Sequence, residues 1–240
     1  AGLLLLTGIF LFTRHFVNLK NLRITPGIVF SGIFLGLLSG LYVVSTQMTT
    51  LANAAFLIYT GPVYSTVLAA IFLKEPFTKA TLASLSAVFV GAMLIVGIIE
   101  WDNGLSVGLQ IGAVEGYPDK ALGDLIALAS GVAYGLYLFV SRYRGDVDSN
   151  TRAYTNFFFA VITLGLLLIF MPPNLSAMTT KSGIILIIAA VVTGAVAFYL
   201  LAFATRLLMA GELATIAYQE TIMAALLGVV LFSETMTFLQ

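Results

Sequence analysis

The sequence predicts an all-α membrane protein, a polytopic bundle of helices, and three observations support this fold class. Of the 240 residues, 60% are hydrophobic and only 9% are charged, whereas about a quarter of the residues in soluble domains carry charge. Apolar runs recur along the chain, and they match the roughly 20 residues that a helix needs to cross a bilayer. The runs lack the alternation of barrel strands, and a helix satisfies every backbone polar group in lipid.

The apolar runs predict seven complete membrane-spanning helices. The opening run from Gly2 to Phe12 is also apolar but is too short to span. The tail from Thr237 to Gln240 resembles the first turn of another helix. We therefore expect about eight helices or parts of helices, in a chain cut at both ends. The complete spans are 27–47, 51–73, 79–99, 121–141, 153–171, 182–204 and 210–232.

The positions of the cations predict the orientation of these helices. The 11 Lys and Arg residues balance the 11 Asp and Glu residues, so no basic excess suggests a nucleic-acid partner. Nine of the 11 cations fall in connections that alternating helices place on one side, and cations accumulate in the cytoplasm. The connection 100–120 is then extracytoplasmic. The nine are Arg14, Lys20, Arg23, Lys74, Lys79, Arg142, Arg144, Arg152 and Arg206.

Several residue types needed for metal or covalent chemistry are absent or rare. The chain has no cysteine, which excludes disulfides, thiolate metal sites and cysteine nucleophiles. Its single histidine, His15, lies in an expected cytoplasmic loop. The sequence also lacks a Walker-type glycine loop for ATP. We expect no metal, no cofactor and no catalytic residue.

An internal repeat relates the two halves of the chain. A shift of 159 positions places residues 41–78 on 200–237 without a gap, with seven of 38 positions identical, among them Tyr59/Tyr218 and Glu75/Glu234. The same shift leaves one helix of each half without its equivalent, so an intact protein would have about ten helices, five in each repeat. An odd number of helices per repeat places the two halves in opposite orientations.

This repeat predicts the domain organisation. We expect a first repeat at 1–99 that lacks its first helix and a second repeat at 121–240 that lacks its last helix. The extracytoplasmic linker at 100–120 would join them. The result is an inverted five-plus-five arrangement, which is typical of many secondary transporters.

Three segments resemble the drug/metabolite transporter superfamily, specifically its EamA-like ten-helix exporters. They are AAFLIYTGPVYSTVLAAIFLKEPFT from Ala54 to Thr78, GDLIALASGVAYGLYLFVSRYRG from Gly123 to Gly145, and ELATIAYQETIMAALLGVVLFSETMT from Glu212 to Thr237. The first has the mid-helix proline of the family's fourth helix. The third resembles the ninth helix, although Thr221 replaces the proline that commonly follows the acidic Glu220.

The resemblance implies a plasma (inner) membrane exporter of a metabolite, an amino acid or a drug-like solute. In this family a central cavity lies between the repeats, and helices three, four, eight and nine line it. These helices correspond to 27–47, 51–73, 182–204 and 210–232 here. A small-molecule solute and the lipid bilayer are then the expected partners.

Glu220 is the first candidate site residue, because an ionisable group deep in an apolar span is expensive. Its carboxylate could receive a substrate ammonium or a coupled proton. The alternative is a hydrogen-bonded glutamate that fastens one helix to another. The neighbouring Gln219 and Thr221 make this turn polar where a lipid-facing helix would be apolar.

Aromatic residues and a proline supply the other cavity candidates. Tyr59 and Pro62 share one helix face. Pro62 removes one backbone donor and leaves a carbonyl exposed. The helix at this proline is then a hinge, the carbonyl is a ligand for the substrate, or the proline only produces a packing kink. Tyr218 repeats Tyr59 in the other half. The remaining candidates add aromatic surface for a planar or cationic solute, or pack the helices: Tyr42, Tyr134 and Tyr199.

Two further patterns predict structure. Glu75 and Glu234 end equivalent helices, and Thr78 is expected to cap the next helix, with a symmetric gate as the alternative role of the glutamates. Small residues four apart predict close helix packing inside one protomer, with a homodimer seam as the alternative. These stripes are Gly32-Gly36-Gly40, Ala83-Ala87-Gly91 and Ala127-Gly131-Gly135.

The leading function hypothesis is a secondary transporter that exports a small solute by alternating access, with proton coupling at Glu220. A non-transporting membrane scaffold or accessory subunit is the alternative. An intramembrane enzyme is a weaker alternative, because the spans hold neither an aspartate dyad nor a serine–histidine pair.

Overall fold

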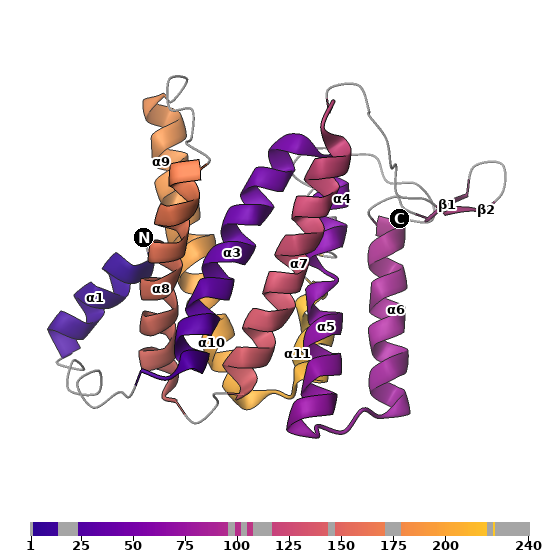
Figure 1. Ribbon diagram of the computed structural model, residues 1–240, viewed down its shortest axis with the longest axis horizontal. Helices are drawn as coiled ribbons and strands as arrows, with labels where there is room; N and C mark the ends of the chain where they lie inside the picture. Colours follow the sequence, from indigo (N-terminus) through magenta and orange to yellow (C-terminus); the bar gives the residue numbers. More distant parts are fainter. Residues whose placement is uncertain are drawn as a thin grey trace. The chain divides into compact units, whose positions relative to one another are not determined.

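The computed structural model describes residues 2–13, 24–95, 99–101, 105–107, 117–143, 147–170, 179–219 and 223. Helices make up nearly all of this part of the chain (Figure 1). Two short strands, β1 (Ile99–Trp101) and β2 (Leu105–Val107), pair in antiparallel fashion, with Ile99 opposite Val107.

The helices follow the predicted spans closely. Their bounds are α1 (Gly2–Thr13), α3 (Pro26–Met48), α4 (Leu51–Ile58), α5 (Gly61–Leu68), α6 (Lys79–Ile95), α7 (Lys120–Tyr143), α8 (Ser149–Phe170), α9 (Thr180–Ala189), α10 (Ala197–Leu207) and α11 (Ala210–Ala217). Two π-helical segments, η1 (Ala69–Leu73) and η2 (Ala190–Val196), continue α5 and α9.

Five helical stretches in the described residues are long and apolar enough to cross a membrane. They are Pro26–Met48, Asn53–Leu73, Lys120–Tyr143, Ser149–Phe170 and Thr180–Leu207. The predicted all-α, polytopic membrane fold is therefore confirmed. Two expected boundaries are wrong. The span 79–99 ends earlier, because α6 stops at Ile95 and Ile99 already belongs to β1, and the helix expected at 153–171 begins earlier, at Ser149.

Polar side chains fix the starts of several helices. The Oγ1 atom of Thr50 accepts the backbone N–H of Asn53 at the start of α4. Thr78 accepts from Thr81 N at 3.1 Å, which confirms that Thr78 caps the next helix, α6. The carboxylate of Asp148 accepts two backbone N–H groups at the start of α8. Such caps satisfy N–H groups that have no partner within the helix.

The chain divides into two compact units. Unit 1 comprises 1–37 and 140–208, and unit 2 comprises 38–139 and 209–240. The division falls within α3 and α7, so each unit draws on both halves of the sequence.

Unit 1 is built around α8. Both α1 and α10 pack against α8, and α1 also contacts η2. Gly32 and Gly36 of α3 lie directly on α8: a Cβ atom on Gly36 would lie 2.7 Å from Thr163 Cβ and 2.9 Å from the Ala160 carbonyl oxygen. This close approach confirms packing within one protomer for Gly32 and Gly36 of the first small-residue stripe.

Unit 2 is built around the helical segments α4, α5 and η1, which follow one another in the sequence. α11 packs against α5 and against α6, and Figure 1 shows these three elements beside one another. α7 approaches the same stretch through glycines: a Cβ atom on Gly135 would lie 2.6 Å from the Gly61 carbonyl oxygen. The stripe on α7 is therefore also confirmed, whereas Gly91, in the stripe on α6, has open space around it within the described residues.

Candidate functional site

A break in the middle of a predicted span marks the candidate site. α4 ends at Ile58, Tyr59 and Thr60 form a turn, and α5 begins at Gly61. Pro62, which is fully buried, occupies the first turn of α5, where the missing N–H of proline is tolerated. The helix is therefore interrupted next to Pro62, and the hinge, solute-ligand and packing roles of this residue stay predictions.

The break releases the backbone carbonyl of Tyr59 from its usual partner. In a regular helix this oxygen would accept the N–H of Val63, but Val63 N donates to Thr60 O instead, at 3.1 Å. The hydroxyl of Tyr218 donates to the Tyr59 carbonyl at 2.5 Å. A backbone carbonyl that has lost its helical partner is tolerated in a membrane helix where another protein group satisfies it, and the Tyr218 hydroxyl performs that role here.

The same break occurs at the equivalent position of the second repeat. The bounds of α4 and α11 differ by 159 residues at both ends, and Tyr59 and Tyr218 follow directly as their C-caps. Their backbone angles agree: φ −71° and ψ −3° for Tyr59, φ −68° and ψ −14° for Tyr218. α11 ends here although Thr221, and not proline, follows in the sequence, so proline is not required for this break.

The two tyrosines meet at the point where these helices end. Their ring centroids lie 5.8 Å apart with an interplanar angle of 40°, and both residues are buried. Ala55, Ile58 and Phe89 pack around the pair. The repeat-related tyrosines therefore form one aromatic cluster, which we call the tyrosine crossing.

Two other predicted residues lie on helices that pack around this break. Tyr134 of α7 faces Gly61: a Cβ atom on Gly61 would lie 2.9 Å from Tyr134 Cβ. Tyr42 of α3 packs against a buried cluster formed by Ala54, Phe56, Leu57 and Ala127. Both rings are half-buried packing residues in this structure.

The remaining predicted site residues, Tyr199, Gln219 and Glu220, are not part of the tyrosine crossing. Tyr199 belongs to unit 1, where its hydroxyl donates to Asn150 Oδ1 at 2.5 Å and its ring packs edge-on against Phe203. Gln219 follows Tyr218 and is exposed. Glu220 lies outside the described residues, so its role stays a prediction.

Sequence reasoning missed a partly buried ion pair in unit 2. Lys120 Nζ lies 2.7 Å from Asp124 Oδ2, and the Lys120 side chain is 0% exposed. The other carboxylate oxygen of Asp124 accepts from Thr49 Oγ1 at 2.5 Å and from Asn53 Nδ2 at 3.3 Å. An aspartate at the start of a helix indicates by sequence only a favourable contact with the helix dipole, whereas this carboxylate joins the start of α7 to the junction of α3 and α4.

Sequence reasoning also missed the role of Arg152 in unit 1. This side chain is only 1% exposed. Its guanidinium donates to the carbonyl oxygens of Ser141, at 2.9 Å, and Ala202, and to Thr205 Oγ1 at 2.9 Å. The cation therefore joins the C-terminal turns of α7 and α10, where helix dipoles favour positive charge. Its position near a helix end had suggested an ordinary cytoplasmic cation.

Glu75 has a specific partner at the far end of the sequence. Its Oε2 atom accepts the backbone N–H of Ala210, the first residue of α11, at 2.9 Å. Lys74 directs the chain into this position with a left-handed backbone, φ 55°, and Glu75 N donates to Ala69 O. A small pocket of about 30 Å³ adjoins this contact, lined in part by Thr66, Thr81 and Gly211.

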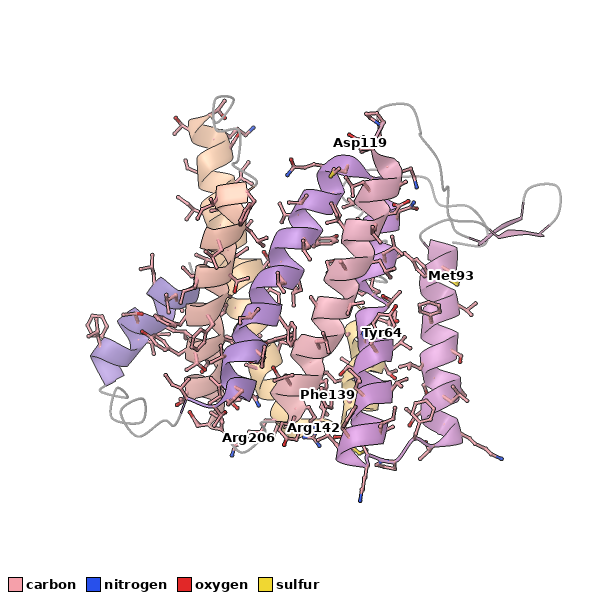
Figure 2. The ribbon with its side chains drawn as sticks, viewed as in Figure 1. Tyr64, Met93, Asp119, Phe139, Arg142 and Arg206 are labelled. Carbon is pink, nitrogen blue, oxygen red and sulfur yellow. The ribbon has the colours of Figure 1, made fainter. Side chains whose placement is uncertain are left out.

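Figure 2 shows how these features are distributed within unit 2: Asp119 lies beside the start of α7 at the upper edge, and Phe139 lies near the lower end of the same helix. The connection from η1 to α6, which carries Glu75, lies at the lower edge (Figure 1). The Asp124 and Glu75 contacts therefore lie at opposite ends of unit 2, with the tyrosine crossing formed by the C-caps of α4 and α11.

Comparisons with known proteins agree with this fold. A solved structure titled only "Crystal structure of protein" superposes with a TM-score of 0.73 over 99% of this chain and 77% of that chain, at 20% sequence identity. That likeness shows the fold alone. No curated protein gives a significant match.

The family comparison is more specific. The model of the EamA-like transporter family matches residues 1–97 and 121–240. This match covers most of the chain and includes α4 with its proline break and α11 with its equivalent break. The chain therefore belongs to the EamA-like transporter family, whose members are multi-pass membrane transporters of the drug/metabolite type.

Proposed function

We propose that this protein is a secondary transporter that exports a small metabolite, such as an amino acid or a drug-like solute, across the plasma membrane. It works by alternating access through a central cavity between its repeats. The observation that carries the proposal is the tyrosine crossing, where repeat-equivalent helices break at equivalent residues. A non-transporting scaffold has no need for matched breaks in two membrane helices.

The breaks supply the moving parts of this mechanism. A helix that loses its regular hydrogen bonds at one turn bends there more easily than a continuous helix, and transporters use such discontinuous helices around their solute sites. Tyr59, Pro62 and Tyr218 are the residues that we assign to the hinge. The aromatic rings of Tyr59 and Tyr218, with those of Tyr42 and Tyr134, offer faces on which a planar or cationic solute can stack.

Glu220 is the residue that we assign to ion coupling. It follows the tyrosine crossing by two residues in the sequence and lies ten residues into the expected span 210–232. A membrane carboxylate that binds a proton on one side and releases it on the other couples solute export to the proton gradient. We place the connection 100–120 outside the cell, as the distribution of cations favours.

The test is uptake of a panel of labelled amino acids into proteoliposomes that hold the protein, with and without an imposed pH gradient. We expect saturable uptake that the gradient accelerates. Glu220→Gln removes the proton site and abolishes the acceleration, while the variant still inserts. Glu212→Gln is the matched control, because it removes an exposed carboxylate from the start of the same helix.

Two results would count against parts of this proposal. Saturable uptake that ignores the gradient in the unmodified protein would exclude proton coupling and leave facilitated diffusion. Failure to take up amino acids, nucleotides, sugars and organic cations alike would contradict transport itself and favour the scaffold.

A further inference from the structure

The starts of α4 and α11 share a feature that the tyrosine crossing does not explain. These repeat-equivalent helices begin at Leu51 and Ala210. Near each start, a carboxylate from a segment distant in the sequence forms a hydrogen bond: Asp124 at α4 and Glu75 at α11. A carboxylate near the first turn of a helix is favoured by the helix dipole, and its hydrogen bonds are about twice as strong as neutral ones.

A close glycine contact accompanies each carboxylate. At α11, a Cβ atom on Gly211 would lie 2.6 Å from Thr81 Cγ2 of α6. At the junction before α4, a Cβ atom on Gly123 would lie 2.9 Å from Thr49 N. Both helix starts are therefore docked tightly and joined by a charged acceptor, so neither can move away without breaking a strong polar contact.

We propose that Asp124 and Glu75 are the two latches of the transport cycle, a proposal that rests on the proposed function. The Asp124 latch, with Thr49 and Asn53, holds the start of α4. The Glu75 latch holds the start of α11 on the connection between η1 and α6. When the protein changes from one open side to the other, one of the two helix starts is released while the other stays bound to its carboxylate. The helices then bend at the tyrosine crossing, which acts as the hinge.

The geometry makes the latches specific to these two carboxylates. Glu212 also lies in the first turn of α11, but its carboxylate accepts from Met209 N at 2.9 Å, one turn away in the same segment. It therefore caps α11 without joining it to another element. Glu212→Gln is a matched control for Glu75→Gln, because both variants remove one carboxylate from the same helix start.

The absence of cysteine from the sequence makes the test direct. Single cysteines placed at Thr66, which is 4% exposed beside the Glu75 latch, and at Ala54, which is 0% exposed near the Asp124 latch, report opening through their reaction with a small methanethiosulfonate reagent. The measurement uses purified protein in nanodiscs and needs no transported solute.

We expect Glu75→Gln to raise the labelling rate of Thr66→Cys about tenfold, since a neutral acceptor forms a much weaker bond than a charged one, and to leave Ala54→Cys unchanged. Asp124→Asn has the reverse effect. Glu212→Gln changes neither rate. Unchanged labelling at Thr66→Cys in the Glu75 variant, or equal acceleration at both positions in either variant, would overturn the proposal, the latter because it indicates general loosening.

A cross-link tests the same latch without removing its charge. With cysteines at Gly211 and Thr81, the Cβ atoms would lie 3.9 Å apart, a separation that suits a disulfide. Oxidation should stop solute exchange in proteoliposomes, and a reductant should restore it. Exchange that continues when the cross-link is complete would refute the Glu75 latch, whereas absence of exchange before oxidation would contradict the proposed function and leave the labelling result standing.

Discussion

The hydroxyl of Tyr218 is the most informative single group to remove. Tyr218→Phe keeps the ring, and with it the 5.8 Å contact with the ring of Tyr59, but removes the 2.5 Å hydrogen bond to the Tyr59 carbonyl. Tyr218 is only 2% exposed, so water does not readily replace the lost donor. The variant therefore isolates the contribution of one hydrogen bond at the helix break.

Two estimates bracket the expected loss. A buried acceptor that loses its donor costs about 1–3 kcal/mol in soluble proteins. Hydrogen bonds between membrane helices contribute about 0.6 kcal/mol on average and at most about 1.7 kcal/mol. We expect Tyr218→Phe to lower the free energy of unfolding by about 1–1.5 kcal/mol, because the released carbonyl lies at a helix break.

The assay is reversible unfolding of the purified protein in mixed micelles of a mild detergent and sodium dodecyl sulfate. Tyr64→Phe, on the exposed face of α5, is the control and should leave the unfolding free energy unchanged. Pro62→Ala restores a backbone N–H and favours a regular helix, so Tyr218→Phe should cost less in that background. Equal losses in the Tyr218 and Tyr64 variants, or strict additivity with Pro62→Ala, would refute our reasoning about the break.

Substitutions at Arg152, Gly131 and Thr78 test the packing within unit 1 and within unit 2, all through the same unfolding measurement, with Arg152→Lys and Gly91→Ala as comparison variants. Arg152→Met should lower the free energy of unfolding by about 3 kcal/mol, because it leaves buried carbonyl oxygens without their charged donor. Arg152→Lys should recover only part of this loss, since an ammonium lacks the guanidinium fork. An Arg152→Met variant as stable as the unmodified protein would contradict the role of this cation. Gly131→Ala should lower the free energy of unfolding by about 1–3 kcal/mol through overpacking against α4, whereas Gly91→Ala should leave it unchanged or raise it. Similar effects at both positions would contradict the close packing of Gly131 on α4. Thr78→Ala should cost about 1 kcal/mol through loss of the α6 cap, and no loss would show that the cap contributes nothing.

Features encoded locally could be predicted from the sequence. Apolar length gives the spans, because lipid permits little except helices. The break before Pro62 follows from its missing N–H, and the 159-residue repeat already pairs Tyr59 with Tyr218. The small-residue stripes on α3 and α7 also predicted close packing, although nothing in the pattern distinguished them from the stripe that ends at Gly91.

Features that depend on distant contacts could not be predicted. An arginine or an aspartate near a helix end has the same sequence signature whether it is solvated or buried, so Arg152 and Asp124 suggested only local roles. Glu75 was assigned to the end of its own helix, but its partner, Ala210, is 135 residues away. α11 breaks at Tyr218 without a proline, because a break depends on the surrounding contacts as well as on the local sequence.

Solute counterflow tests the central claim, alternating access, most directly. Proteoliposomes are loaded with an unlabelled solute from the uptake panel and diluted into a trace of the same labelled solute. A carrier that binds solute on one side at a time predicts a transient accumulation of label above its equilibrium level, which the oxidised Thr81→Cys/Gly211→Cys protein lacks. Label that enters only to equilibrium, at the rate seen with protein-free liposomes, would contradict the account.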